Sequence, residues 1–291
     1  MGRMRFPLLI VFAAVVCIAG FSVFAEAEDE SSSQKESGTE ELRTGKNFME
    51  TKVYTAEEDE RILELFEGLR VADVSDGMDK AGLGHIGRMS PEIHPSWKDT
   101  DEFTHRFIGV AVTARYVPTN HPIPRGLSGD EFDEWVGKWY GEKSPEAFKP
   151  LIREGTALVI DDASAEDVGS IGSNNIMSWR LAGCEGVVTD STARDIDEVA
   201  AEGIPLYFRH PGRGIRPGRN ELESVNRPIE CGGVLVEPGD VIVADGDGVV
   251  VVPRARAEEV AVYAGATLDS DKAGRRKLYE RLGIPLDDSV K

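Results

Sequence analysis

The stretch between residues 172 and 209 constrains the fold more than any other part of the sequence. A glycine turn leads into a helical pattern, "GSNNIMSWRLAG", and the apolar run "GVVTD" that follows has the length of a buried strand. A second helical pattern ends at Gly203, and "IPLYFR" is again typical of a strand. Helices that alternate with short strands in this way predict a mixed α/β domain, with both kinds of element layered around one core.

The flanking segments extend this architecture. We expect a helix over 55–70, in which Thr55 forms a capping box with Glu58, and a second helix over 71–82 that is capped by Ser75 or Asp73. Four apolar residues of the first helix share its buried face: Ile62, Leu65, Phe66 and Leu69. Runs rich in β-branched residues predict strands at 107–117 and 156–162 and a series of β segments over 229–253, and a helix over 256–283 closes the chain.

An aromatic segment separates the strands at 107–117 and 156–162. Within "DEFDEWVGKWYGE", residues 130–142, apolar side chains recur at helical spacing and predict an amphipathic helix with an aromatic stripe. The stripe consists of Phe132, Trp135, Val136, Trp139 and Tyr140. A stripe of this kind is more often part of a core or of a subunit contact than a platform for a ligand.

The N-terminus indicates an export signal. Arg3 and Arg5 precede an uncharged apolar run that ends in small residues at Ala25, so we expect a signal peptide over 1–25 and a periplasmic or secreted protein. An uncleaved N-terminal anchor is the alternative, because the run is just long enough to span a bilayer. Residues 26–50 are polar and charged, which predicts a disordered acidic linker. The domain should cover 51–265, with inserts near 89–106 and 119–150, and 266–291 should form a helical tail.

Charge excludes one class of partner. The chain has 52 acidic and 33 basic residues, a net charge of −19. Binding to phosphate needs a basic surface, so we expect no nucleic-acid partner and, after signal cleavage, no membrane association. Cys184 and Cys231 lack the spacing of a zinc site, and the sequence favours two buried thiols over a disulfide.

The sequence "ARDIDE" offers the strongest candidate chemistry. Asp195 and Glu198 share one face at the start of a predicted helix, where capping alone would explain both carboxylates. Arg194 does not fit that explanation, because a cation is unfavourable at a helix N-terminus. An anion bound there, between the guanidinium and backbone N–H groups, would explain it. The turn at 169–175 could supply such N–H groups, and a hard oxygen ligand such as Asp195 favours Mg²⁺ or Mn²⁺ over zinc.

These segments, in this order, resemble the family of regulator of ribonuclease activity A, the RraA-like proteins. This family includes the 4-hydroxy-4-methyl-2-oxoglutarate aldolases and members formerly described as demethylmenaquinone methyltransferases. The resemblance covers roughly 55–262 outside the two inserts. It is carried by "VSDGMD" (74–79), "IGVAVTAR" (108–115), "GSNN" (172–175), "GVVTDSTARDIDE" (186–198), "GIPLYFR" (203–209) and "VNRPIECGGVLVEPGDVIVADGDGVVVVP" (225–253).

The resemblance implies a fold and an assembly. It predicts an α/β fold, a single layered β/β/α domain similar to the swivelling domain of phosphotransfer enzymes, with extra N- and C-terminal helices. Members of the family assemble as homotrimers or hexamers with sites between subunits, and the same assembly is expected here.

The resemblance also implies residue roles. In the aldolases the Asp of Arg-Asp binds the divalent metal, here Asp195, and the Arg, here Arg194, contacts the pyruvate-like carboxylate. Glu198 would support the metal through water. The substrate would be held by Arg194 and the glycine turn, which consists of Gly172, Ser173, Asn174 and Asn175.

One catalytic position departs from the family pattern. The aldolases carry an acid 21 residues before the Arg, where this chain has Ser173. A serine without an activating neighbour cannot act as the general base at neutral pH, and Glu166 or Asp167 are the nearby acids that could substitute.

The resemblance thus predicts a class II, metal-dependent lyase acting on a small 2-oxo acid. The reaction would be retro-aldol cleavage of a 4-hydroxy-2-oxo diacid giving pyruvate, oxaloacetate decarboxylation, or both, through a metal-stabilised enolate. The alternative is a non-catalytic RraA-like binding or regulatory protein of the cell envelope, which could use the aromatic insert to contact its partner.

Overall fold

The computed structural model describes residues 39, 40, 42–162 and 167–291. The chain divides into two compact units, residues 1–50 and 51–291. In the first unit, residues 39, 40, 42 and 43 are helical and every described side chain is exposed. The expected signal peptide and residues 26–38 of the expected linker lie outside the described residues. Among the helices that are described, none is long and apolar enough to cross a membrane.

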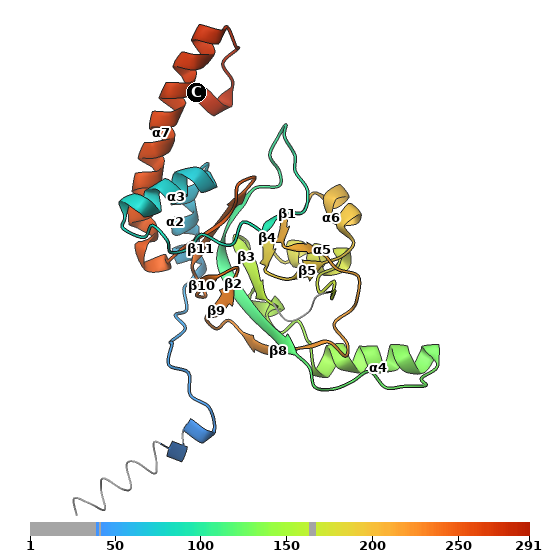
Figure 1. The fold of residues 1–291 in the computed structure, drawn as a ribbon. Helices are drawn as coiled ribbons and strands as arrows, with labels where there is room; N and C mark the ends of the chain where they lie inside the picture. Colours follow the sequence, from blue (N-terminus) through green and yellow to red (C-terminus); the bar gives the residue numbers. More distant parts are fainter. Residues whose placement is uncertain (1–38, 41, 163–166) are drawn as a thin grey trace, which may run out of the picture. The chain divides into compact units, whose positions relative to one another are not determined.

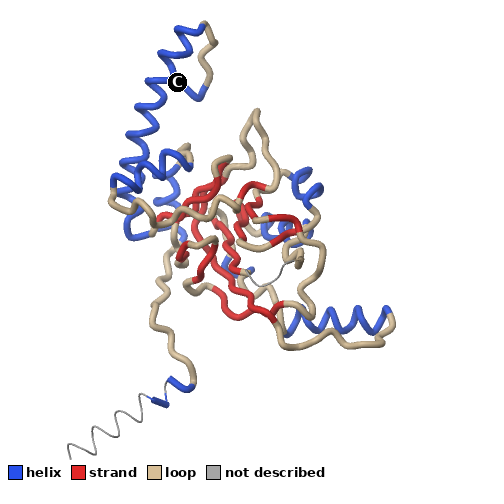
Figure 2. The backbone as a smooth tube through the Cα atoms, viewed as in Figure 1, coloured by secondary structure: helices blue, strands red, loops and turns tan. Residues whose placement is uncertain are grey.

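A mixed eight-stranded sheet forms the centre of the second unit (Figures 1 and 2). The strand order is β1-β6-β4-β3-β2-β11-β12, and β8 pairs with the second half of β2. Strands β2, β3, β4 and β6 run parallel to one another, while the other pairs are antiparallel. The strands are β1 (His94–Pro95), β2 (Phe107–Pro118), β3 (Thr156–Asp161), β4 (Cys184–Thr189), β6 (Leu206–Phe208), β8 (Asn220–Val225), β11 (Val241–Asp245) and β12 (Gly248–Val252).

The sheet curls into a nearly closed barrel. The segment before β1 reaches β12, where the Met89 N–H donates to the Val249 carbonyl at 3.2 Å and Arg88 forms a β-bridge with Val250. Apolar side chains from most strands fill the interior. The hairpin of β9 (Ile229–Cys231) and β10 (Val234–Val236) adds four buried side chains to the same core.

Helices cover the outside of the sheet in two groups (Figure 1). One group packs on β11 and β12, and the other packs on β3, β4 and β6. The first group is α2 (Ala56–Phe66), α3 (Val71–Lys80) and the start of α7 (Ala257–Leu282), and the second is α5 (Ser173–Leu181) and α6 (Ile196–Glu202). The remaining long helix, α4 (Gly129–Glu142), lies in the segment 119–150 that we expected to be an insert. The mixed α/β fold is therefore as predicted.

Most predicted elements are confirmed, with differences at their ends. Thr55 caps α2 with the expected capping box, although Leu65 is 45% exposed and not on the buried face. Helix α3 begins at Val71 as predicted, but its N-cap is Arg70 rather than Ser75 or Asp73. The Asp73 carboxylate accepts a hydrogen bond from the Arg70 N–H at 3.0 Å. Ser75 lies inside the helix, so the prediction that it caps the helix is wrong. Helix α7 runs unbroken through residue 265, so no helix end marks the predicted start of the C-terminal tail.

The aromatic stripe of α4 is packed at one end and half-exposed at the other. Trp139 is buried, and its Nε1 donates to the Asn220 carbonyl at 3.2 Å. Trp135 stacks on Trp139 and Phe132 on Trp135, with ring centroids 5.5 and 5.6 Å apart. Tyr140, next to Trp139, stays 39% exposed. The expectation that the stripe forms core therefore holds for Trp139 but not for Tyr140.

The two described cysteines are free thiols. Cys184 and Cys231 are both buried in the apolar cores of the sheet. Burial raises the pKa of the Cys184 thiol to about 11, so it stays protonated and unreactive at neutral pH.

Candidate functional site

The Arg194–Asp195 turn connects the short strand β5 (Thr192–Ala193) to α6 through an uncommon backbone conformation. Asp195 has φ 57° and ψ 39°, the left-handed region that few residues other than glycine adopt. Its carbonyl accepts the first bond of α6 from the Val199 N–H at 3.0 Å, while its side chain makes no capping hydrogen bond. The capping role that the sequence suggested for the Asp195 carboxylate is therefore wrong.

The Asp195 carboxylate instead faces the start of α5. Its Oδ2 accepts a hydrogen bond from the Ser173 N–H at 3.2 Å and lies 3.9 Å from Arg194 Nε. Ser173 is the first residue of α5, so its N–H is one of the free donors of a helix N-terminus. The two turns follow β3 and β4, and ligands commonly bind beyond the carboxyl ends of parallel strands. The structure thus brings the two predicted motifs together.

Gly172 allows the two turns to approach each other. A Cβ at this position would lie 2.7 Å from Asp195 Oδ2, 3.4 Å from Arg194 Nε and 3.7 Å from Asn175 Oδ1. The requirement is steric, because Gly172 itself has an extended backbone with φ −117°. Any side chain there would collide with these polar atoms, so glycine is needed for the two turns to come this close. We take the space beside Gly172 that these atoms border as the candidate ligand site.

Arg194 contributes an unsatisfied donor to this space. Its Nε is shielded from solvent and has no hydrogen-bond partner among the described residues, although the side chain as a whole is 38% exposed. The 3.9 Å separation from Asp195 Oδ2 is too long for a hydrogen bond. A buried donor without an acceptor costs about 1–3 kcal/mol, and an oxygen of a bound anion would remove that cost.

The other predicted residues differ in how closely they join the site. Asn174 is exposed, whereas Asn175 is half-buried and its Nδ2 donates to Glu146 Oε1 at 2.6 Å. Glu198 is exposed on the first turn of α6. It makes no hydrogen bond or ion pair with the residues that the structure describes, so it is open to solvent or a hydrated ion.

Neither acid suggested as a substitute base is established in that role. Asp167 forms a two-oxygen ion pair with Arg213, at 2.7 Å from Nη2 and 3.1 Å from Nε. The hydrogen bonds from Arg213 hold the pKa of Asp167 below its usual value, which makes it a weaker base. Glu166 lies outside the described residues. The half-buried Ser173 therefore gains no activating partner from Asp167.

A buried polar network supports the turn behind the site. Arg216 and Asp162 are almost completely buried and form an ion pair at 3.2 Å, and the Arg216 guanidinium lies 3.5 Å from the centre of the Tyr116 ring. Asp162 also accepts from the Ser170 hydroxyl at 2.6 Å, and Arg216 Nε donates to the Ser170 carbonyl at 3.1 Å. The next residue, Ile171, accepts the Arg194 N–H at 2.8 Å, so the network fixes the turn against Arg194.

The segment 119–150, expected to be an insert, contributes to the site in a way that the sequence pattern did not indicate. Glu146 contacts Asn175, as described above, and the phenol of Tyr140 lies in the electrostatic field of Arg194. Burial raises the pKa of the Tyr140 hydroxyl, an effect that the nearby charges of Arg194 and Arg216 partly offset. Nothing in the local pattern around these residues indicates contacts with α5 or with the Arg194 turn, because the contacts join distant parts of the chain.

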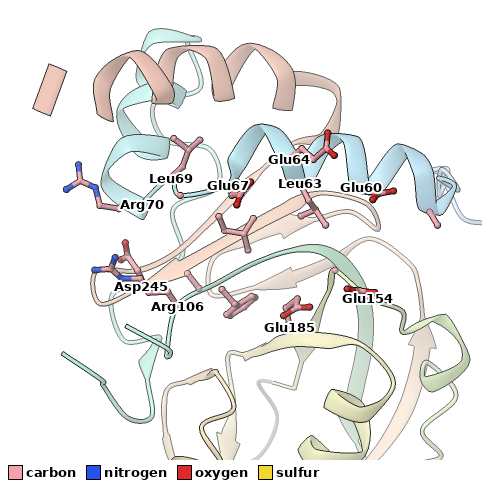
Figure 3. A pocket seen from close by; sticks show the side chains of 16 residues that line it. Glu60, Leu63, Glu64, Glu67, Leu69, Arg70, Arg106, Glu154, Glu185 and Asp245 are labelled. Atoms are coloured by element: carbon pink, nitrogen blue, oxygen red, sulfur yellow. The ribbon is translucent and has the colours of Figure 1, made fainter. Parts of the chain in front are cut away.

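A groove lies elsewhere, away from the Arg194–Asp195 turn. A groove of about 730 Å³ runs beneath α2, and Figure 3 shows its acidic lining on both sides. Six acidic side chains line the groove against two arginines: Glu60, Glu64, Glu67, Glu154, Glu185 and Asp245, with Arg70 and Arg106. A groove with this charge repels an anionic oxo acid, and none of the predicted site residues lines it. The region at Gly172, where Arg194 Nε and the N-terminus of α5 lie, is therefore the better candidate.

Comparisons with known proteins point to one family. The model of the RraA-like family (Aldolase/RraA) matches residues 71–251, more than half of the chain. A protein of Halalkalibacterium halodurans named "Putative 4-hydroxy-4-methyl-2-oxoglutarate aldolase" is 31% identical over 127 residues, which are 43% of this chain and 60% of that protein. Protein DlpA of Legionella pneumophila is 28% identical over 199 residues, 65% of this chain and 27% of its own length. The chain thus spans less than two thirds of these relatives.

Solved structures share the fold. RraAS2 of Streptomyces coelicolor, described as an unusual member of the RNase ES inhibitor RraA protein family, has a TM-score of 0.59 at 20% identity and covers 78% of this chain and 98% of its own. An uncharacterized protein of Pseudomonas syringae pv. tomato has a TM-score of 0.57 at 25% identity, with 80% of this chain and 98% of its own covered. At 20% identity the likeness to RraAS2 extends to the fold alone.

Proposed function

Because the chain belongs to the RraA-like family, we propose that it is a divalent-metal-dependent lyase that acts on a small 2-oxo acid. The observation that supports this most directly is the Arg194–Asp195 turn, which faces the N-terminus of α5 across Gly172. There, one carboxylate, one unsatisfied guanidinium N–H and a helix N-terminus border a single small space. The names of relatives such as the Halalkalibacterium protein support an aldolase-type lyase.

The donor set fits Mg²⁺ or Mn²⁺ better than zinc. Within the described part of the chain, no group of three His, Cys, Asp or Glu side chains comes together to hold a metal. Mg²⁺ often takes only one or two protein carboxylates and keeps several waters. Asp195 would bind the ion directly and Glu198 through water. The ion would polarise the 2-oxo group and stabilise the enolate oxygen as the C–C bond breaks.

The protein groups bind and orient the substrate. The Arg194 guanidinium would pair with the substrate's 1-carboxylate, which supplies the acceptor that its Nε lacks. The positive end of α5 adds to the attraction for this anion, and the glycine turn, with Asn174 and Asn175 on the first turn of α5, would enclose it.

Decarboxylation suits this site better than retro-aldol cleavage. Retro-aldol cleavage requires a base to remove the proton of the 4-hydroxyl group as the C–C bond breaks, and Ser173 stands where the aldolases carry an acid. Decarboxylation of oxaloacetate releases CO₂ and leaves the electron pair in the enolate without removal of a proton. The enolate then takes its proton from water. We therefore propose oxaloacetate, or a 2-oxo diacid like it, as the substrate.

The test is pyruvate release from oxaloacetate with Mg²⁺ or Mn²⁺. We expect a rate above the metal-only blank that falls by at least tenfold in Asp195→Ala, because the metal loses its carboxylate. Asp197→Asn is the matched control, since Asp197 is exposed on the same helix. A wild-type rate equal to the blank would contradict the proposal, as would an Asp195→Ala variant as active as wild type. A parallel assay with 4-hydroxy-4-methyl-2-oxoglutarate separates decarboxylation from aldol cleavage.

The alternative function is non-catalytic binding, and the half-exposed rings of Phe132 and Trp135 on α4 favour it. Three results together would support it: wild type has no lyase activity, Asp195→Ala retains the partner, and replacement of both rings by serine abolishes partner binding.

We propose in either case that the protein is exported and forms a homotrimer or hexamer. Size measurement by light scattering and fractionation of the expressing cells test these two points.

A further inference from the structure

Glu146 links the insert to the helix that begins at the candidate site. Its Oε1 accepts a hydrogen bond from Asn175 Nδ2 at 2.6 Å, and its Oε2 accepts one from Trp179 Nε1 at 3.1 Å. The two donors stand one turn apart on α5. Trp179 is 2% exposed and packs edge-on against Phe148, with ring centroids 5.4 Å apart, so its N–H direction is fixed. The carboxylate is therefore held by a rigid donor and in turn holds the amide of Asn175.

This contact fixes which end of the Asn175 amide faces the site. A carboxylate only accepts hydrogen bonds, so Asn175 must turn its NH₂ group towards Glu146 and its carbonyl oxygen away. That oxygen, Oδ1, lies 3.7 Å from the position that a Cβ of Gly172 would occupy, and Asp195 Oδ2 lies 2.7 Å from the same point. Two oxygens, one of them charged, therefore lie beside Gly172 on the side where its Cβ would project.

We propose that Glu146 is a positioning residue that orients Asn175 so that its Oδ1 joins Asp195 in holding the divalent metal or a water bound to it. This inference rests on the metal-dependent function proposed above. Amide oxygens are suitable ligands for hard cations, whereas an NH₂ group turned towards the cation would repel it. Asp195 is the single carboxylate that would bind the metal directly. Through Asn175 Oδ1, Glu146 would provide a second oxygen. Changes to residues that orient a metal ligand commonly reduce metal affinity 10–100-fold.

Glu146→Gln tests the orientation with minimal change of shape. Glutamine has one acceptor oxygen and one NH₂ group, but it faces two donors, Asn175 Nδ2 and Trp179 Nε1. Trp179 cannot turn in its buried position, so the glutamine oxygen stays with it and the NH₂ group faces Asn175. The Asn175 amide then reverses and points its own NH₂ group at the metal.

We expect the Kd for Mn²⁺ in Glu146→Gln, measured by electron paramagnetic resonance of free Mn²⁺, to rise at least tenfold. Thermal unfolding by circular dichroism, measured in parallel, should change little if the helix stays folded. Glu142→Gln is the matched control, because Glu142 is an exposed acid at the end of α4 and the substitution removes the same charge from the insert. Its Kd should equal that of wild type.

A swap of the two side-chain types provides the decisive variant. In Glu146→Gln/Asn175→Asp, the glutamine NH₂ group donates to one aspartate oxygen and the other oxygen faces the metal. We expect Mn²⁺ affinity to return to the wild-type value or better. Asn175→Asp alone places two carboxylates in contact and should lower the unfolding temperature, so the two changes should be strongly non-additive.

The outcomes separate this inference from the function on which it rests. If wild type binds Mn²⁺ and Glu146→Gln binds it equally well, Glu146 does not position a ligand and only this inference falls. A folded swap variant that fails to recover affinity has the same consequence. If wild type binds no Mn²⁺, the metal-dependent function falls together with the inference. If Mn²⁺ affinity follows the expected series but oxaloacetate is not cleaved, the inference stands and the reaction is wrong.

Discussion

Asp195 shows how one backbone conformation decides the role of a carboxylate. An aspartate that caps its own helix normally has an extended backbone and turns its side chain onto the N–H groups of the next turn. At φ 57° the side chain makes no capping hydrogen bond to α6, and Oδ2 accepts from the Ser173 N–H of α5 instead. The sequence Asp-x-x-Glu therefore matches a capping box without forming one. Such strain costs about 1–3 kcal/mol and is typical of functional sites.

Gly172→Ala tests whether the space between the turns is the site. The new Cβ would meet Asp195 Oδ2 at 2.7 Å and push the carboxylate away from the Ser173 N–H. We expect kcat/KM for oxaloacetate to fall at least tenfold, with only a modest loss of stability because the displaced atom is the end of a side chain. The measurements are steady-state kinetics and the thermal unfolding temperature.

Gly137→Ala is the control for this substitution. Gly137 lies within α4, and a Cβ there would meet no atom within 4 Å. Alanine should stabilise the helix by about 0.5–1 kcal/mol and leave kcat/KM unchanged. Equal losses of activity in both variants, or none in Gly172→Ala, would show that the space at Gly172 is not where the substrate binds.

At the scale of elements, the site depends on loops that a buried ion pair holds in place. Arg216, from the loop before β8, pairs with Asp162 at the end of β3 and also holds the Ser170 carbonyl. Removal of one partner from a buried pair leaves an uncompensated charge, which costs far more than loss of an exposed pair. The turn at 169–172 lies outside the helices and strands; apart from the Gly172 carbonyl, which accepts the first bond of α5 from the Ile176 N–H at 3.1 Å, it relies on this network.

Arg216→Met should therefore lower the free energy of unfolding by about 3–5 kcal/mol, measured by urea denaturation. Arg213→Met is the matched control: Arg213 binds Asp167 at a shorter distance, 2.7 Å, but its side chain is 87% exposed. We expect no measurable change there, because solvent screens the pair. A control that loses as much stability as Arg216→Met would contradict the role given to burial.

Local patterns predicted the elements well where a local contact determines them. The Thr55–Glu58 capping box and the glycine that ends α6 involve residues only a few positions apart, so the sequence contains the whole signal. The start of α3 at Val71 was predicted, but its N-cap was missed because an arginine is an unusual N-cap, held there through Asp73. The link from Glu146 to Asn175 spans 29 positions and has no local signature, so only the fold could reveal it.

At the scale of the whole molecule, excess negative charge and buried carboxylates both lower the stability of the fold as the pH rises towards 7. The net charge of −19 at neutral pH favours expansion of the folded chain by self-repulsion. Burial raises the pKa of the carboxyl groups of Asp161, Asp190 and Asp240, to about 6 for the first and last. Hydrogen bonds lower the pKa of several exposed acids, such as Glu131 and Asp167. The acids with a raised pKa stabilise the folded state at low pH and lose this contribution as the pH rises. The acids with a lowered pKa stabilise it at higher pH and lose their contribution as the pH falls.

We therefore predict that stability is greatest near pH 4.5–5 and declines towards pH 7. An acid with a raised pKa binds more protons in the folded state, so its contribution is complete below the unfolded value near 4 and is lost as the pH rises through about 6. For Asp240 alone the loss is on the order of 2 kcal/mol, at about 1.4 kcal/mol per pKa unit. The acids with lowered pKa act below pH 4, where stability should fall again. Urea denaturation at several pH values measures the whole curve.

Asp240→Asn and added salt separate the two causes of the decline. Asp240 accepts hydrogen bonds from the N–H groups of Glu237 and Arg254, and asparagine can replace only one of these acceptors, so the variant should be less stable at low pH. Its stability should nevertheless fall less between pH 5 and 7, because one titrating carboxyl group is gone. Salt screens the repulsion between exposed charges but hardly affects a buried carboxyl group, so 0.5 M NaCl should recover only the remaining part of the loss. An unchanged slope in Asp240→Asn would mean that self-repulsion alone sets the pH dependence.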